Sequence, residues 1–96
     1  MSRRRVVVTG LGLVCPVGNS VAEGWANLIA GRSGIDHITR FDAAAFACRF
    51  AGEVKGFDAT QYIDRKQVRR TSRTTHLAIA AATMALQDAQ LDVTQI

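Results

Sequence analysis

The order of apolar and polar positions predicts a short buried strand near the start of the chain. Residues 4–9 (RRVVVT) carry a continuous β-branched apolar run that is closed by Gly10. Continuous rather than alternating hydrophobicity is typical of a strand that is covered on both faces. A glycine-rich connection over residues 10–18 follows, and Pro16 argues against a helix that begins inside it.

A helix is expected over residues 21–30, because both of its ends carry local signals. Ser20 and Glu23, three residues apart, form a capping box, and Gly31 stands where a helix C-terminus favours glycine. The apolar residues recur at helical spacing and fall on one face. They are Val21, Trp25, Leu28 and Ile29.

The middle of the chain predicts little regular structure. Residues 31–47 are interpreted as an irregular surface segment that Phe41 and Phe46 anchor to a core. Residues 49–54 alternate between polar and apolar or small side chains, which predicts a short strand. A short helical turn is expected over residues 59–63.

The longest predicted helix spans residues 74–90, and its central part leaves almost no polar face. Residues 77–86 are apolar except at Thr83. A helix that is apolar all round must be covered all round. The amphipathic helix and the two short strands expected elsewhere cannot surround it. We therefore expect residues 1–96 to be an incomplete portion of a larger domain.

Basic residues cluster between positions 64 and 73. With helical spacing, five of the 12 lysines and arginines would fall on one face. These five are Arg65, Lys66, Arg69, Arg70 and Arg73. Most charge runs are solvated helix faces, and that interpretation stays open. Because five like charges repel one another, a negatively charged partner is the alternative.

Composition narrows the class of protein. A chain of 96 residues is at most one domain. Its 48% hydrophobic and 21% charged residues are typical of a soluble globular protein and argue against disorder. The net charge of +4 allows an acidic partner without naming one. No apolar run reaches the roughly 18 residues that a membrane-spanning helix needs. Two cysteines are too few for a disulfide-stapled secreted scaffold, so a cytoplasmic location is expected.

The pair Gly10-x-Gly12 after a predicted strand invites comparison with the dinucleotide-binding pattern G-x-G-x-x-G. Cys15 stands where the third glycine is required, and Pro16 would disturb the helix that cradles the pyrophosphate. The short-chain-dehydrogenase variant of this pattern fails as well. The sequence therefore favours a tight structural turn over a nucleotide site.

No other residue pattern indicates a catalytic or metal centre. Cys15 and Cys48 lack a zinc-ligand spacing and a neighbouring base, so both are interpreted as structural. His37 and His76 lack a carboxylate partner at a telling spacing and are also interpreted as structural. For nucleic acid, the basic cluster has only Tyr62 as a neighbouring aromatic residue and no recognised binding motif.

Four motifs in succession resemble one family. They are TGxGxxxPxG within RRVVVTGLGLVCPVGN, GxSGI within AGRSGI, the strand FAGEVK, and the basic segment YIDRKQVRR. Together they resemble the N-terminal segment of the β-ketoacyl-acyl-carrier-protein synthases II, which are condensing enzymes of bacterial fatty-acid elongation. The resemblance implies an α/β chain that forms the N-terminal part of a thiolase-like, five-layered αβαβα fold. It also implies that residues 1–96 are about the first quarter of a homodimeric enzyme.

The resemblance implies a decarboxylative condensation of malonyl-acyl-carrier protein with an acyl-enzyme thioester. The family's nucleophilic cysteine and both catalytic histidines lie beyond Ile96, so residues 1–96 are expected to be inactive alone. No metal and no organic redox cofactor is implied.

A basic patch that binds acyl carrier protein is implied at Lys66, Arg69 and Arg70, with Arg65 adjacent. Three alternatives remain open, the first within the resemblance and the other two from the residues alone. They are a polyketide-type ketosynthase, a non-catalytic basic module that binds an acidic protein, and a nucleic-acid-binding fragment.

Overall fold

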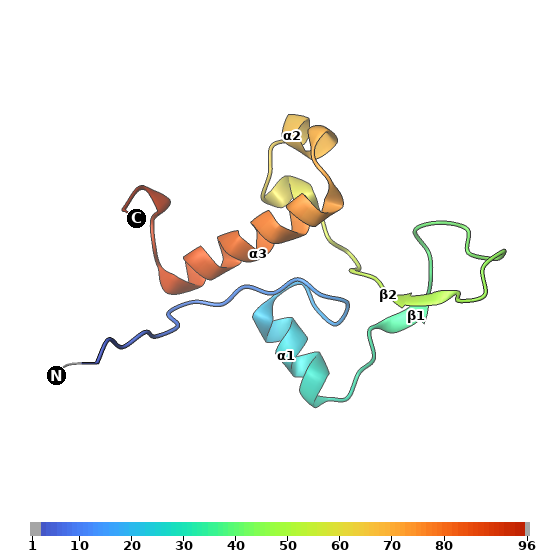
Figure 1. The fold of residues 1–96 in the computed structure, drawn as a ribbon, viewed down its shortest axis with the longest axis horizontal. Coiled ribbons are helices and arrows are strands. Elements are labelled where there is room, and N and C mark those ends of the chain that lie inside the picture. The colour runs from blue at the N-terminus through green and yellow to red at the C-terminus, as the bar shows by residue number, and fades with distance from the viewer. Residues whose placement is uncertain (1–2, 96) are drawn as a thin grey trace.

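The computed structural model describes residues 3–95, and its helices and strands form an open arrangement rather than a closed globule (Figure 1). The order is α1 (Val21–Ile29), β1 (Ile35–His37), β2 (Phe50–Gly52), the 3-10 turn η1 (Ala59–Gln61), α2 (Arg65–Arg70), α3 (Arg73–Ala89) and the 3-10 turn η2 (Val93–Gln95). The radius of gyration is 17.0 Å, whereas a compact domain of this length has about 12 to 13 Å. The described chain therefore closes little of its own apolar surface.

Helix α1 forms where its end signals predict it. The Ser20 hydroxyl oxygen accepts a hydrogen bond from the Glu23 amide at 3.1 Å. At the other end, Gly31 has a left-handed φ of 71° and its amide donates to the Leu28 carbonyl. The Arg32 amide reaches back to the Asn27 carbonyl at 3.0 Å, which completes a Schellman motif. The prediction of a helix over residues 21–30 is confirmed to within one residue.

The predicted strand over residues 4–9 is wrong for the described part of the chain. These residues run along an extended path with no neighbouring strand, and Val6 is 95% exposed. A strand exists only where a second strand satisfies its backbone donors and acceptors. The described residues contain one sheet, made of β1 and β2 alone, and neither strand lies beside residues 4–9.

Strand β2 confirms the prediction over residues 49–54, whereas β1 lies inside the segment predicted to be irregular. The two strands pair antiparallel, with Ile35 opposite Gly52 and His37 opposite Phe50. The aromatic residues of the intervening loop do not anchor it to a core. Phe41 and Phe46 pack edge to face at 5.8 Å, and both remain more than half exposed.

The glycine-rich connection packs against α3. A Cβ atom added at Gly12 would overlap the Ala81 carbonyl oxygen, and one added at Gly10 would overlap the carbonyl oxygen of Ala85. The amide of Leu11 donates to the Asp88 carboxylate at 2.9 Å. The glycines are therefore needed for a close approach of two backbones. This contact covers the side of α3 that carries Ala81 and Ala85.

Helix α3 confirms the predicted long helix, but the described residues do not cover it all round. Ala78 and Ala82 are exposed, and Ile79 keeps 37% of its surface in solvent. No helix among residues 3–95 is long and apolar enough to cross a membrane.

Candidate functional site

The basic cluster lies on two helices instead of one. Helix α2 ends at Arg70, because the next two residues leave the helical conformation. Thr71 is extended, with φ −122° and ψ 160°. Ser72 is also extended and caps α3, since its hydroxyl oxygen accepts a hydrogen bond from the Thr75 amide at 3.4 Å. The prediction that five charges share one helix face is therefore wrong for Arg73.

Arg73 belongs to the first turn of α3 and is used inside the fold. Its guanidinium group donates to the Val54 carbonyl at 3.2 Å. It also lies 6.0 Å from the centre of the Phe57 ring, a distance at which a cation is attracted to an aromatic face. Phe57 in turn stacks on Tyr62, with the ring centres 6.1 Å apart. Arg73 therefore ties α3 to the segment that follows β2.

The remaining four basic residues form an exposed surface on α2. They are Arg65, Lys66, Arg69 and Arg70, which we call the basic surface. All four side chains are exposed, and Val68 is the half-buried residue of the same helix. The expected positions therefore come together on a single helix of six residues. Figure 1 shows α2 beyond the N-terminal end of α3, away from α1 and the N-terminal segment.

One carboxylate lies close enough to the basic surface to respond to it. The pKa of Asp58 is lowered from its ordinary value, first by a hydrogen bond from the Thr60 hydroxyl at 2.6 Å. The Thr60 amide and the positive charge of Arg65 lower this pKa further. Asp58 thus stays ionised near neutral pH and caps η1, as the predicted helical turn over residues 59–63 requires.

In the part of the chain that the structure describes, no hydrogen bond joins any of the two cysteines and two histidines to another of the four. Cys15 is half-buried in the turn of the glycine-rich connection, and Cys48 is exposed with its thiol 3.5 Å from the Phe50 carbonyl. His37 is exposed on β1, whereas His76 is buried at the start of α3. Among residues 3–95, no three histidine, cysteine or acidic side chains gather as metal ligands would.

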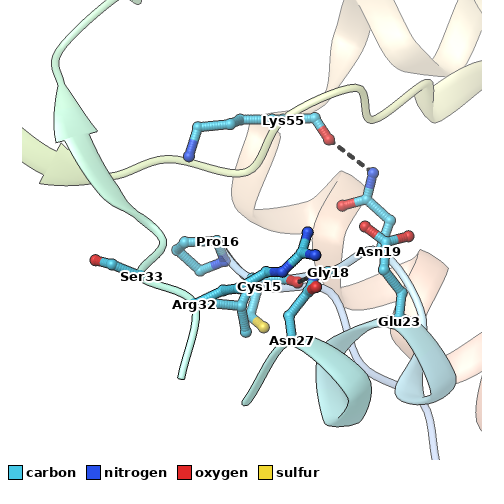
Figure 2. A pocket seen from close by; sticks show the side chains of 10 residues that line it. Cys15, Pro16, Gly18, Asn19, Glu23, Asn27, Arg32, Ser33 and Lys55 are labelled. Carbon is cyan, nitrogen blue, oxygen red and sulfur yellow. Dashed lines mark hydrogen bonds between the residues drawn. The ribbon is translucent and has the colours of Figure 1, made fainter. Parts of the chain in front are cut away.

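A polar cavity of about 250 Å³, which the sequence did not predict, lies beside the glycine-rich connection (Figure 2). The Asn27 amide donates to the Val17 carbonyl at 2.6 Å, and the Asn19 amide donates to the Lys55 carbonyl at 2.8 Å. The Lys55 ammonium lies 3.3 Å from the Gly34 carbonyl. These donors are therefore directed at backbone carbonyls, and they join the connection to α1 and to the segment after β2. Asn19 just before α1 and Asn27 near its end were the signal available in the sequence.

Comparison with known proteins gives consistent matches along the whole chain. Residues 3–96 match the family profile described as "Beta-ketoacyl synthase, N-terminal domain". The chain is 50% identical over 96 residues to 3-oxoacyl-[acyl-carrier-protein] synthase 2 of Synechocystis sp., which covers 100% of the chain and 23% of that protein. The enzyme of the same name from Staphylococcus aureus is 46% identical over 92 residues, covering 96% of the chain and 22% of that protein.

A solved structure gives the same picture. It is titled "The ishigamide ketosynthase/chain length factor", and it superposes with a TM-score of 0.88 at 41% sequence identity. The match covers 99% of this chain and 24% of that chain. This chain therefore spans about a quarter of the length of the relatives that it matches.

Proposed function

Since this chain belongs to the β-ketoacyl synthase family, whose N-terminal domain its residues 3–96 match, we propose that it is part of a condensing enzyme of fatty-acid elongation. The relatives at 46% and 50% identity carry the name 3-oxoacyl-[acyl-carrier-protein] synthase 2. The likeness to a ketosynthase structure confirms the expected thiolase-like fold class. The names of these relatives support the fatty-acid enzyme over a polyketide-type ketosynthase.

Residues 1–96 are an incomplete N-terminal portion of the ketosynthase domain in this proposal. The apolar surface that the described residues leave open supports it. Val6 is 95% exposed, and Trp25 on α1 is 61% exposed, which is unusual for large apolar side chains in a finished domain. In this proposal the full-length enzyme is a cytoplasmic homodimer, and its remaining residues cover this apolar surface.

The proposed reaction proceeds through a covalent intermediate. A cysteine thiolate attacks the acyl thioester of the carrier protein, and the carrier thiol leaves. Malonyl-carrier protein then loses CO2, and the resulting carbanion attacks the enzyme-bound thioester. The cysteine thiolate leaves, and the carrier holds a 3-oxoacyl chain that is two carbons longer. The family resemblance assigns the cysteine and its two histidines to positions beyond Ile96. Neither Cys15 nor Cys48 is proposed as the nucleophile.

Within residues 1–96, the functional role we propose is binding of acyl carrier protein by the basic surface. The observation that best supports this role is that neighbouring arginines differ in their contacts. Arg73 contacts a carbonyl and an aromatic ring inside the fold, whereas Arg69 and Arg70 on the adjacent helix are exposed to solvent. An acidic protein surface would match four exposed positive charges and would be steered towards them in solution.

The experiment that tests the proposed reaction supplies acyl- and malonyl-carrier protein to the full-length protein that contains residues 1–96. Mass spectrometry of the carrier should show a 3-oxoacyl product with two additional carbons. The 96-residue chain alone should give no product above background. Elongation by the chain alone, or a thioester formed on Cys15 or Cys48, would contradict the assignment of catalysis to residues outside it.

A further inference from the structure

Helix α2 needs support from outside itself to hold the basic surface. It has six residues, and isolated helices shorter than about 12 to 15 residues are marginal in water. Its N-cap residue, Asp64, makes no side-chain capping bond, and none of its residues is fully buried. Two arginines in its last turn repel each other. The orientation of the basic surface therefore depends on contacts made by α2 with its neighbours.

The carbonyl end of α2 is held by residues that follow it in the chain. The Thr71 hydroxyl donates to the Gln67 carbonyl at 2.5 Å. The His76 Nε2 atom lies 3.1 Å from the Val68 carbonyl oxygen and 2.9 Å from the Thr71 hydroxyl oxygen. The last four carbonyls of a helix have no partner within it, so these contacts satisfy groups that would otherwise be open.

The network determines which atom carries the proton. A carbonyl oxygen can only accept, so the contact with Val68 requires a hydrogen on the His76 Nε2 atom. The Thr71 hydroxyl has already placed its one hydrogen on the Gln67 carbonyl, so its oxygen also accepts from Nε2. One N–H group of His76 therefore bridges the last turn of α2 and the residue that ends it.

His76 is in a position to transmit the placement of α3 to α2. It lies in the first turn of a helix of 17 residues and keeps only 9% of its surface in solvent. The same helix packs against the glycine-rich connection farther along. A side chain fixed in α3 thus determines where the carbonyl end of α2 lies, and with it the adjacent Arg69 and Arg70.

We infer that His76 is a positioning residue for the basic surface, acting through its Nε2–H bonds to the end of α2. This inference rests on the proposed binding of acyl carrier protein by that surface. It assigns His76 no contact with substrate and no role in proton transfer. Its specific content is that the hydrogen-bond donor at Nε2, rather than the size of the ring, sets the affinity for the carrier.

The test compares three forms of the full-length protein: unchanged, His76→Leu and His76→Gln. Leucine removes the donor, whereas glutamine places an amide N–H at about the reach of Nε2. For His76→Leu we expect KM for acyl-carrier protein to rise about fivefold, the scale of losing one or two exposed charge contacts. The kcat value and KM for a short pantetheine thioester should stay nearly unchanged. His76→Gln should restore KM for the carrier-linked substrate.

Hydrogen exchange over residues 65–72 provides a readout that does not depend on carrier binding. Exchange should be faster in His76→Leu and return to the original rate in His76→Gln. Thr71→Val removes the neighbouring hydroxyl and should raise KM for the carrier in the same direction, so it carries the test if His76→Leu is insoluble. Thr74→Val, at an exposed position of the same turn of α3, is the matched control and should change neither quantity.

The outcomes separate this inference from the proposal that it rests on. If reversing the charges of the basic surface leaves KM for the carrier unchanged, the binding proposal itself fails and His76 has nothing to position. If charge reversal raises KM but His76→Leu does not, only the role of His76 is wrong. Equal losses with both substrates, or no rescue by glutamine, would reduce His76 to a general packing residue and would overturn the inference.

Discussion

Helices α2 and α3 follow one another in the chain but are held in place in opposite ways. Helix α3 has 17 residues. Its backbone lies so close to Gly10 and Gly12 that any side chain added at either glycine would overlap a carbonyl oxygen of the helix. Helix α2 has six residues, four of them exposed and charged, and its carbonyl end is held by hydrogen bonds from Thr71 and His76. Apolar and small side chains are used for internal contact in α3, and charged side chains are left in solvent in α2.

The difference indicates what each helix is for. Backbone packing such as that between Gly12 and α3 depends on fit and tolerates no added atom. The basic surface makes a poor contribution to folding, because exposed like charges repel one another. Arg73 shows that an arginine in this region is used internally where a carbonyl and an aromatic ring are within reach. The four residues of the basic surface are exposed to solvent instead, and they are therefore available to a partner.

The largest effect on folding is expected when residues 1–96 are produced without the rest of the full-length protein. The isolated 96-residue chain should self-associate or lack a cooperative unfolding transition, since burying a large apolar side chain is worth roughly 1.5–3 kcal/mol. Val6, Trp25 and Leu28 are among the side chains left more than half exposed. Light scattering after size exclusion and a thermal melt test this directly. A monodisperse monomer with a sharp transition would show that the described contacts suffice.

Next in size is Gly12→Val, which tests the close approach on α3. The new side chain would overlap the Ala81 carbonyl and should destabilise the full-length protein by about 3 kcal/mol or more. The matched control is Gln87→Val, at an exposed polar position of the same helix, which should cost less than about 1 kcal/mol. Thermal unfolding of both variants measures the difference. Equal effects would mean that the contact between the connection and α3 is looser than the structure shows.

The two N-caps give a smaller contrast between the helices. Ser72→Ala removes the bond to the Thr75 amide at the start of α3 and should cost about 1 kcal/mol. Asp64→Ala removes a side chain that makes no capping bond on α2, so it should change the free energy of unfolding by less than about 0.5 kcal/mol. Denaturant unfolding of the two variants checks the order. A larger loss for Asp64→Ala would reverse the account of how the two helices begin.

The smallest expected effect is a pH dependence beside α2. Because the pKa of Asp58 in the folded chain lies below its ordinary value of 3.8, its contribution is present above that pH and is lost as pH falls through the folded pKa. Thr60→Val should raise the pKa of Asp58 more than Arg65→Ala does, since the hydroxyl is the larger cause. A carboxyl NMR titration measures both. The opposite order would place Arg65 closer to Asp58 than the structure has it.

Elements with local signals could be predicted from the sequence, and elements with distant partners could not. Helix α1 was found to within one residue, because Ser20 and Gly31 mark its ends. Strand β1 was missed, since its three residues become a strand only by pairing with β2, from which a loop separates them. Residues 4–9 look like a strand in composition, yet no strand lies beside them among residues 3–95.

The basic surface was predicted in part for the same physical reason. Spacing alone placed Arg65, Lys66, Arg69 and Arg70 together, and the structure has them on one exposed helix. Spacing also included Arg73, because it assumed one continuous helix. In the structure the extended residues Thr71 and Ser72 end α2 before α3 begins. The serine at position 72 was the available signal, since serine is favoured at an N-cap. No pattern in the sequence indicated that His76 would contact the carbonyl of Val68.

The central claim is that the basic surface binds acyl carrier protein, and one variant tests it most directly. Lys66→Glu, Arg69→Glu and Arg70→Glu are combined in the full-length protein, and KM is measured for acyl-carrier protein and for a short pantetheine thioester. Like charges across an interface cost several kcal/mol, so KM for the carrier should rise by about tenfold or more, and less so at high salt. The small thioester should be used about as before. Equal losses with both substrates, or no loss with either, would contradict the claim.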